Sequence, residues 1–229
     1  MSEARPALSI IMPVLDEGPT IVATFEALAP LRARGAEVIV VDGGSGDDTV
    51  ARAKPLADQV VGSARGRALQ MNAGAMAARG DVFVFLHADT RLPADADLLI
   101  LDGIARSGRA WGRFDVRIEG AHPLFPVIAF FMNARSRLTG IATGDQAMFV
   151  KRAAFTTVFG FPLIALMEDI ALSRTLKRVS PPLCLRARVT TSGRRWEKRG
   201  VARTILLMWR LRLAYFFGAA PDDLARRYG

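Results

Sequence analysis

The strongest constraint on the fold is an alternation of short apolar runs with longer segments that suit helices. Four runs of strand length occur in the first 106 residues, at Leu8–Pro13, Glu37–Asp42, Gln59–Gly62 and Asp81–Leu86. Each run is followed by a turn and a stretch with helical spacing of its apolar residues. This order is typical of strand–helix–strand units, whose strands pair in parallel. The sequence therefore predicts an α/β fold with a mostly parallel sheet flanked by helices.

The second half of the chain has a different pattern. Residues Trp111–Ile118 alternate as in an exposed or antiparallel strand, and Gln146–Val150 and Leu183–Thr190 look similar. No repeat, low-complexity tract or linker rich in Pro, Gly and Ser separates the two halves. We therefore expect a single domain over residues 1–229, in which both halves share one sheet and one core.

The charge is concentrated at the C-terminal end. The chain has 31 basic and 22 acidic residues, and residues 184–229 hold 11 basic and 3 acidic ones. A protein that binds nucleic acid along its surface would spread its positive charge more evenly. A nucleic-acid-binding protein is therefore only a third interpretation, and no nucleic acid is expected as a partner. An arginine-rich genome is the plainer explanation, because only four of the basic residues are Lys.

Cysteine content and hydropathy exclude several classes of protein. Cys184 is the only cysteine, so no internal disulfide forms and no cysteine-rich zinc site is available. The longest uncharged windows, 120–134 and 153–167, are shorter than the roughly 20 apolar residues that span a bilayer. Residues 1–8 lack a secretory signal pattern, so we expect a cytoplasmic protein.

Polar residues follow the predicted strands where ligands of open α/β sheets bind. Asp16 and Glu17 follow the first strand, Asp42 ends the second, and Asp89 follows the fourth. Singly, each has a structural explanation, because Asp and Glu favour helix starts. Together with Arg67 they would gather several carboxylates at one edge, which costs free energy unless a cation or a phosphate joins them.

Another structural explanation concerns the glycine-rich turn after the second strand. Ser45 with Asp48 fits a helix capping box, and the glycines between Asp42 and Asp47 suit a sharp turn.

The usual nucleotide-binding fingerprints are missing. No GxGxxG follows a predicted strand and no GxxxxGK[ST] occurs, which excludes most dinucleotide enzymes and P-loop ATPases. A carboxylate-rich edge without these glycines favours a nucleotide held through its base, its ribose and a divalent ion. Oxygen ligands such as Asp89 select Mg²⁺ or Mn²⁺.

Five ordered segments resemble the motifs of family 2 glycosyltransferases. They read SIIMPVLDE, EVIVVDGGSGDDT, RGRALQMNAGAMAARGD, VFVFLHADT and LMEDIALSRTL. The similarity spans about residues 8–200 and is greatest to a short bacterial group associated with radical-SAM and selenium-related proteins. It implies the Rossmann-like GT-A fold, with a nucleotide-binding half at 1–106, an acceptor half at 107–200 and a helical extension at 201–229.

The resemblance also implies roles for individual residues on the donor side. Asp42 corresponds to the acid that reads the base, and Asp89 to the last Asp of a DxD motif that holds the diphosphate through a divalent metal. In this chain the motif reads His87-Ala88-Asp89, so it supplies one carboxylate. The complete set implied for the nucleotide sugar is Pro13, Asp16, Glu17, Asp42, Gly44, Arg67, Asn72, His87, Ala88, Asp89, Arg194, Arg195 and Trp196.

The pair Glu168 and Asp169 corresponds to the family's catalytic acids. Asp169 would be the general base that deprotonates an acceptor hydroxyl, giving inversion at the anomeric carbon. The structural alternative is a pair of acids at a helix start. Gly144, Asp145 and Gln146 match a segment near the acceptor.

The predicted function is therefore a metal-dependent inverting glycosyltransferase, with a UDP-sugar as the expected donor. The alternative is a nucleotide-binding module without turnover, suggested by His87 where a first carboxylate would stand. Ser192 replaces the Gln or Arg of processive members, which disfavours polymerisation.

Residues 201–217 form a predicted amphipathic helix. Its apolar positions include Trp209, Leu213 and Phe216, and Arg203 and Arg210 share a face with the preceding Arg199. Packing against the sheet or against a second subunit, as a homodimer, is the commoner use of such a helix. The other interpretation is peripheral contact with the inner face of the membrane, where the enzyme would meet a lipid-linked acceptor.

Overall fold

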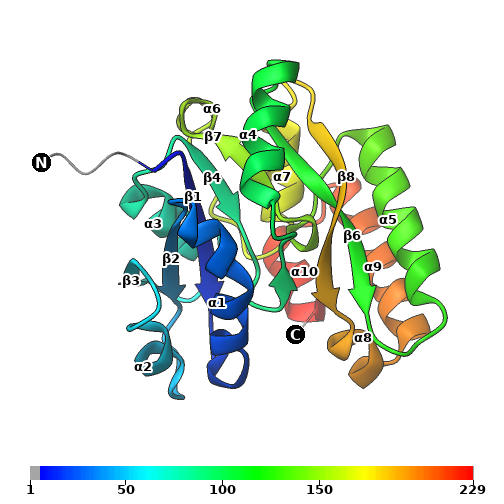
Figure 1. The fold of residues 1–229 in the computed structure, drawn as a ribbon. Coiled ribbons are helices and arrows are strands. Elements are labelled where there is room, and N and C mark those ends of the chain that lie inside the picture. Colours follow the sequence, from blue (N-terminus) through cyan, green and yellow to red (C-terminus); the bar gives the residue numbers. More distant parts are fainter. Residues whose placement is uncertain (1–5, 229) are drawn as a thin grey trace, which may run out of the picture.

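The computed structural model describes residues 6–228, without the side chains of Arg195 and Arg199. One eight-stranded sheet runs through this part of the chain, in the order β3-β2-β1-β4-β7-β6-β8-β5 (Figure 1). The strands are β1 (Leu8–Val14), β2 (Glu37–Asp42), β3 (Gln59–Gly62), β4 (Val82–Phe85), β5 (Thr90–Arg91), β6 (Trp111–Glu119), β7 (Phe149–Lys151) and β8 (Leu183–Ser192).

Helices cover both faces of the sheet. In Figure 1, α1 and α4 lie in front of it, and α3, α6 and α7 lie behind it. The helices of residues 6–228 are α1 (Gly18–Ala33), α2 (Thr49–Ala53), α3 (Arg67–Ala77), α4 (Ala96–Ser107), α5 (Phe125–Thr139), α6 (Arg152–Thr157), α7 (Glu168–Leu176), α8 (Arg194–Arg199), α9 (Val201–Phe216) and α10 (Pro221–Tyr228), with a 3₁₀ turn η1 (Gly144–Gln146).

The sheet is parallel on its N-terminal side and mixed on the other. Strand β1 pairs in parallel with both β2 and β4, and β2 pairs in parallel with β3. Strand β7 is antiparallel to β4 and β6, whereas β6 is parallel to β8. The α/β fold with a sheet flanked by helices is confirmed.

Two strand predictions in the second half need adjustment. Strand β6 is largely buried and has an antiparallel partner on one side only. Within the predicted strand Gln146–Val150, residue Gln146 belongs to η1, and pairing begins at Phe149. A short polar stretch such as Gly144–Gln146 favours a turn over a strand.

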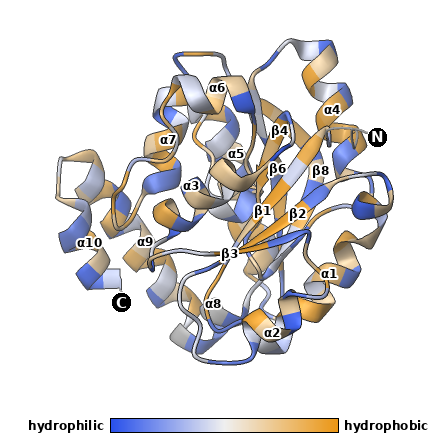
Figure 2. Ribbon diagram, turned by 90° about the vertical axis from the view of Figure 1, so that its left-hand side faces the viewer, coloured by the Kyte–Doolittle hydropathy of each residue, from blue (hydrophilic) through white to orange (hydrophobic). Residues whose placement is uncertain are grey.

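Alternating residues of the central strands fill two cores, one on each face of the sheet. Ile10 and Met12 of β1 belong to the core under α1 and α4, whereas Ile11 belongs to the core under α3. In Figure 2 these central strands carry the hydrophobic colour along their length. Burial on both faces explains why β1 and β2 are continuous apolar runs.

Helix α3 approaches the sheet closely at one glycine. A Cβ on Gly74 would lie 2.4 Å from Cγ2 of Ile11 and 2.8 Å from Cγ2 of Val41. A side chain at this position would therefore push the helix away from β1 and β2. Since α3 begins with Arg67, this packing also places that arginine at the carboxyl edge of the strands.

Helices α7, α9 and α10 meet in a third, smaller core that includes Met167, Ile170, Leu211 and Leu224. This core attaches the C-terminal extension below the sheet. Among the described helices, none is long and apolar enough to cross a membrane.

Candidate functional site

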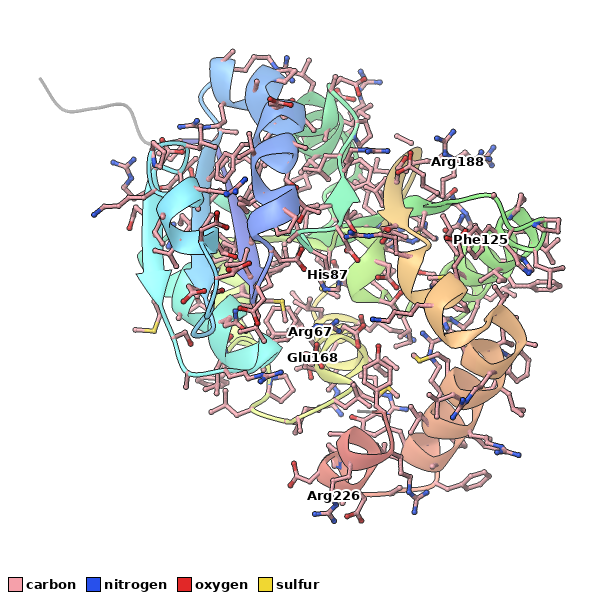
Figure 3. The ribbon with its side chains drawn as sticks, turned by 90° about the horizontal axis from the view of Figure 1, so that it is seen from below. Arg67, His87, Phe125, Glu168, Arg188 and Arg226 are labelled. Atoms are coloured by element: carbon pink, nitrogen blue, oxygen red, sulfur yellow. The ribbon has the colours of Figure 1, made fainter. Side chains whose placement is uncertain are left out.

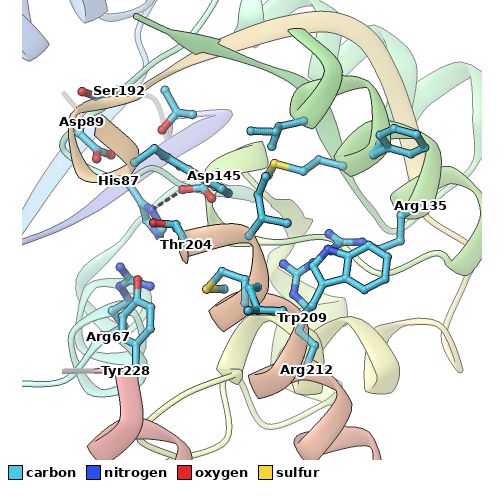
Figure 4. A pocket seen from close by; sticks show the side chains of 18 of the residues that line it. Arg67, His87, Asp89, Arg135, Asp145, Ser192, Thr204, Trp209, Arg212 and Tyr228 are labelled. Atoms are coloured by element: carbon cyan, nitrogen blue, oxygen red, sulfur yellow. Dashed lines mark ion pairs between the residues drawn. The ribbon is translucent and has the colours of Figure 1, made fainter. Parts of the chain in front are cut away.

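One large cavity, of about 1450 Å³, joins the carboxyl ends of the parallel strands to the C-terminal helices. On the strand side its wall includes Pro13, Glu17, Arg67, His87, Ala88 and Asp89. The opposite wall consists of α5 and α9, which contribute mostly apolar side chains. Asp145 of η1 lies on the wall between the two sides, as Figure 4 shows.

A basic and an acidic helix start face each other in this region. Helix α3 begins at Arg67, after a glycine with φ of 145°, and α7 begins at Glu168, after Met167 with φ of 70°. Arg67 is accessible from the cavity, where partial desolvation tends to lower its pKa, but the charges of Glu168, Asp145, Tyr228 and Asp169 raise it overall. In the view from below, Arg67, His87 and Glu168 gather in the middle of the molecule (Figure 3).

Both acids of α7 have raised pKa values. Burial is the main cause for Glu168, which is 4% exposed, and the charge of Asp169 adds to it. Arg67 opposes this rise by stabilising the carboxylate form. Two poorly solvated carboxylates side by side hold protons more tightly than isolated ones, because the charged form of each is repelled by the other.

Backbone N–H groups orient Asp169. Its Oδ2 accepts a hydrogen bond from the N–H of Gly144 at 2.9 Å, and its Oδ1 accepts one from its neighbour Ile170 at 2.7 Å. Burial raises the pKa of Asp169 more than these bonds and Arg67 lower it. A fixed carboxylate with a raised pKa is suited to accept a proton near neutral pH.

His87 lies between the strand edge and η1. Its Nδ1 is 3.7 Å from Oδ1 of Asp145, the contact drawn as a dashed line in Figure 4. The absence of a side chain at Gly144 makes this approach possible, because a Cβ there would lie 2.4 Å from Nε2 of His87. The segment 144–146, expected near the acceptor, thus meets the segment 87–89, expected near the donor.

The acids after β1 and β2 organise a loop. Asp42 accepts hydrogen bonds from the N–H of Gly44 at 3.0 Å and from Oγ of Ser45 at 2.5 Å. Asp16 accepts one from the N–H of Gly46 at 2.8 Å. Ser45 therefore does not form the capping box considered for Ser45 and Asp48. It bonds to Asp42 instead, and α2 begins without a side-chain cap. Asp16, Asp42 and Gly44 lie beside the cavity but are not part of its wall.

Several further residues of the expected site have structural contacts. The amide of Asn72 exchanges hydrogen bonds of 2.8 and 2.9 Å with the backbone of Phe161. Gln146 is fully buried, and the exposed Arg194 donates to Ser192 at 3.2 Å. Trp196 lines the cavity, whereas the side chain of Arg195 lies outside the described residues.

Arg135 is a part of the site that sequence reasoning missed. It projects from α5 into the cavity, where the charges of Asp169 and Asp145 act on it. The segment from Phe125 to Thr139 has the sequence of an ordinary apolar helix, and Arg135 within it does not belong to any of the motifs. A charged residue inside such an apolar segment is the feature that could have indicated a site. Tyr228 of α10, drawn beside Arg67 in Figure 4, was also not anticipated.

The donor set determines which metal the site could hold. Within residues 6–228, no three His, Cys, Asp or Glu side chains gather into a metal-binding group. Asp89 therefore offers one carboxylate at the cavity wall. This arrangement fits Mg²⁺ or Mn²⁺, which bind nucleotides through one or two carboxylates plus phosphate and water oxygens, and does not fit a closed zinc site.

Comparisons with known proteins agree with this fold. The sequence matches the family described as Glycosyl transferase family 2 over residues 9–159. No curated protein sequence matches the chain.

Several solved structures share the fold. Mannosyltransferase PcManGT from Pyrobaculum calidifontis, in complex with GDP-Man and Mn²⁺, has a TM-score of 0.67 and 21% identity, with 99% of this chain and 70% of that one covered. S. aureus TarS 1–349 with UDP has a TM-score of 0.65 and 16% identity, covering 81% and 60%. Glucosyl-3-phosphoglycerate synthase from Mycobacterium tuberculosis, with Mn²⁺, UDP and phosphoglyceric acid, has a TM-score of 0.60 and 19% identity, covering 82% and 70%. The chain thus spans about 60% of the TarS 1–349 structure.

Proposed function

Because the chain belongs to glycosyl transferase family 2, we propose that it is an inverting glycosyltransferase that uses a nucleotide sugar, with a UDP-sugar as the expected donor. One observation carries the proposal. Arg67, Glu168 and Asp169 act on one another electrostatically beside the cavity whose wall includes His87 and Asp89. The solved structures of the same fold were crystallised with UDP, UDP-GlcNAc and GDP-Man. We assign residues 1–106 to donor binding and residues 107–200 to the acceptor side.

In this proposal the strand edge binds the donor. Asp89 would hold a divalent cation on the diphosphate, and that cation would neutralise charge as the diphosphate leaves. Arg67 provides a positive charge that would bind a phosphate oxygen, since its guanidinium lies in the cavity wall. The loop fixed by Asp16 and Asp42 lies beside the same edge, where it would contact the base and ribose.

Asp169 is the proposed general base. As the acceptor oxygen bonds to the anomeric carbon, its proton passes to the carboxylate of Asp169, and the bond from that carbon to the phosphate oxygen breaks. The nucleoside diphosphate leaves with the bonding electron pair from the face opposite the attacking oxygen, so the configuration inverts. The bond from the N–H of Gly144 keeps one oxygen of Asp169 in place. The neighbouring Glu168, whose pKa is raised by burial and by the charge of Asp169, interacts electrostatically with this base.

Donor hydrolysis tests this proposal. Purified protein with Mn²⁺ is incubated with a panel of UDP-sugars and GDP-sugars, and release of nucleoside diphosphate is measured with and without EDTA. We expect slow, Mn²⁺-dependent release from one donor, since water can replace the acceptor. Tight nucleotide binding without release from any donor would instead favour the nucleotide-binding module, which the single carboxylate of His87-Ala88-Asp89 suggests.

A further inference from the structure

Helices α5 and α9 form one wall of the cavity, and this wall has an unusual composition. It exposes eight large apolar side chains, each 48% to 87% accessible and each lining the cavity. They are Val127, Phe130, Phe131, Leu138, Leu206, Trp209, Leu213 and Phe216. Exposed apolar surface of this extent marks a surface that binds something.

The same two helices carry positive charge only. Arg135 and Arg137 lie on α5, Arg203, Arg210 and Arg212 lie on α9, and neither helix contains an acidic residue. Arg137 pairs with Asp115 on β6. Arg135, Arg210 and Arg212 line the cavity.

Two of these arginines have buried nitrogens without a partner. Nε and Nη2 of Arg135 and Nε of Arg212 are inaccessible to solvent, yet no described protein atom accepts a hydrogen bond from them. Figure 4 shows the two side chains directed to the same part of the cavity, next to Trp209. Buried donors are nearly always paired, so this place is suited to an anionic ligand.

We propose that the wall formed by α5 and α9 binds an anionic lipid, with its headgroup at Arg135 and Arg212 and its chains along the apolar side chains. The inference rests on the proposed function, because it makes an anionic lipid with a hydroxyl-bearing headgroup the acceptor. The cavity is continuous from this wall to Asp145. Arg135 and Asp145 line the same cavity, and Gly144, next to Asp145, donates a hydrogen bond to the proposed base Asp169, so a headgroup at Arg135 shares a cavity with the turn that holds the base.

Charge favours a lipid over a second copy of the chain. In a two-fold dimer the same surface meets itself, so the arginines of α5 and α9 would face the same arginines of the other copy. Neither helix offers a carboxylate to neutralise them. An anionic membrane surface complements both properties of this wall, because it accepts aromatic and aliphatic side chains and attracts arginine.

Vesicle sedimentation tests the proposal. The chain of 229 residues is centrifuged with vesicles of phosphatidylcholine alone and of phosphatidylcholine mixed with an equal amount of phosphatidylglycerol. We expect binding to the mixed vesicles only. Trp209→Gln combined with Leu213→Gln should weaken it about tenfold or more. Arg135→Gln and Arg212→Gln should each weaken it about fivefold, as expected for one arginine at an anionic surface.

Matched substitutions outside the cavity provide the controls. Leu98→Gln changes an α4 leucine that is 53% exposed, close to the 59% of Leu213. Arg106→Gln removes one charge from the other side of the protein, where the side chain is 80% exposed. Both should bind vesicles like the wild type. Glycerol phosphate, at the phosphate concentration of the vesicles, should leave binding unchanged.

Each contrary result overturns the lipid assignment. It fails if the wild type ignores mixed vesicles, if the controls lose as much binding as the cavity variants, or if glycerol phosphate releases the protein. It also fails if light scattering shows a dimer that Trp209→Gln and Leu213→Gln dissociate, with no vesicle binding. UDP titration of the same proteins separates the two proposals, because failure of the lipid assignment leaves UDP binding intact, whereas absence of UDP binding contradicts the proposed function.

Discussion

The two walls of the cavity differ in how their polar groups are satisfied. Beside the strand edge, Asp16 and Asp42 accept hydrogen bonds from the backbone and Ser45 of one loop, so the loop next to the donor wall is held by the protein itself. On the helical wall, Arg135 and Arg212 retain buried nitrogens without protein partners. Unpaired buried donors cost free energy, and this is the wall at which we propose that an anionic lipid binds. The polar groups beside the strand edge thus have partners within the protein, whereas Arg135 and Arg212 keep donors that a ligand could bind.

The largest expected effect is at Asp169, which is bonded to the turn between the two walls. Asp169→Asn should lower kcat for sugar transfer about 100- to 10,000-fold, because an amide cannot take up the acceptor proton. UDP binding should stay nearly unchanged, since the donor wall is left intact. Steady-state kinetics and UDP titration measure the two quantities. Asp102→Asn on the surface of α4 is the control, and full turnover by Asp169→Asn would exclude it as the base.

The loss of stability at two neighbouring arginines shows whether each one has partners within the protein. Arg113 is fully buried and bonds to Asp115 and to the carbonyl of Asn133, so Arg113→Met should lower the free energy of unfolding by about 3 kcal/mol. Arg135→Met should change it by less than about 1 kcal/mol, since Nε and Nη2 lose no protein partner. Urea unfolding measures both, and equal losses would mean that Arg135 is held by the protein.

The close packing of α3 against the strands predicts a smaller loss of stability when Gly74 is replaced. Gly74→Ala should lower the free energy of unfolding by about 2 kcal/mol, because the added Cβ would overlap Ile11 and Val41. Gly62→Ala is the control, since no atom lies within 4 Å of a Cβ built there. Chemical unfolding of both variants tests this. If the free energy of unfolding changed equally little for both variants, α3 would not be packed tightly against β1 and β2.

The smallest effect concerns pH. The pKa of Glu168 is raised in the folded protein by burial, so its contribution to stability is present at low pH and is lost as the pH rises through the folded pKa. Glu168→Gln removes the titrating group and should gain about 1 kcal/mol over the wild type at neutral pH. The gain should shrink toward pH 4. Unfolding at several pH values measures it, and a gain largest in acid would contradict the raised pKa.

Much of the fold could be predicted from the sequence, because strands buried on both faces leave a clear pattern. The runs at Glu37–Asp42 and Gln59–Gly62 coincide with β2 and β3. The short strand β5, at Thr90–Arg91, was not predicted, since two residues carry no periodicity and depend on pairing with β8. The assigned roles of the site residues stay predictions, including those of Pro13, Asn72 and Trp196.

The sequence alone determined the alternating strands and helices, the order of the motifs and the acids that follow the strands, because these depend on local spacing and residue type. Tertiary structure decided that Asp16, after β1, bonds to Gly46 of the loop after β2, and that Arg135 of α5 enters the cavity that Asp145 also lines. It also brought α9 and α5 to the same wall, which leaves their apolar side chains exposed to one cavity. Such contacts join residues far apart in the chain, and local patterns carry no information about which distant group will satisfy a side chain.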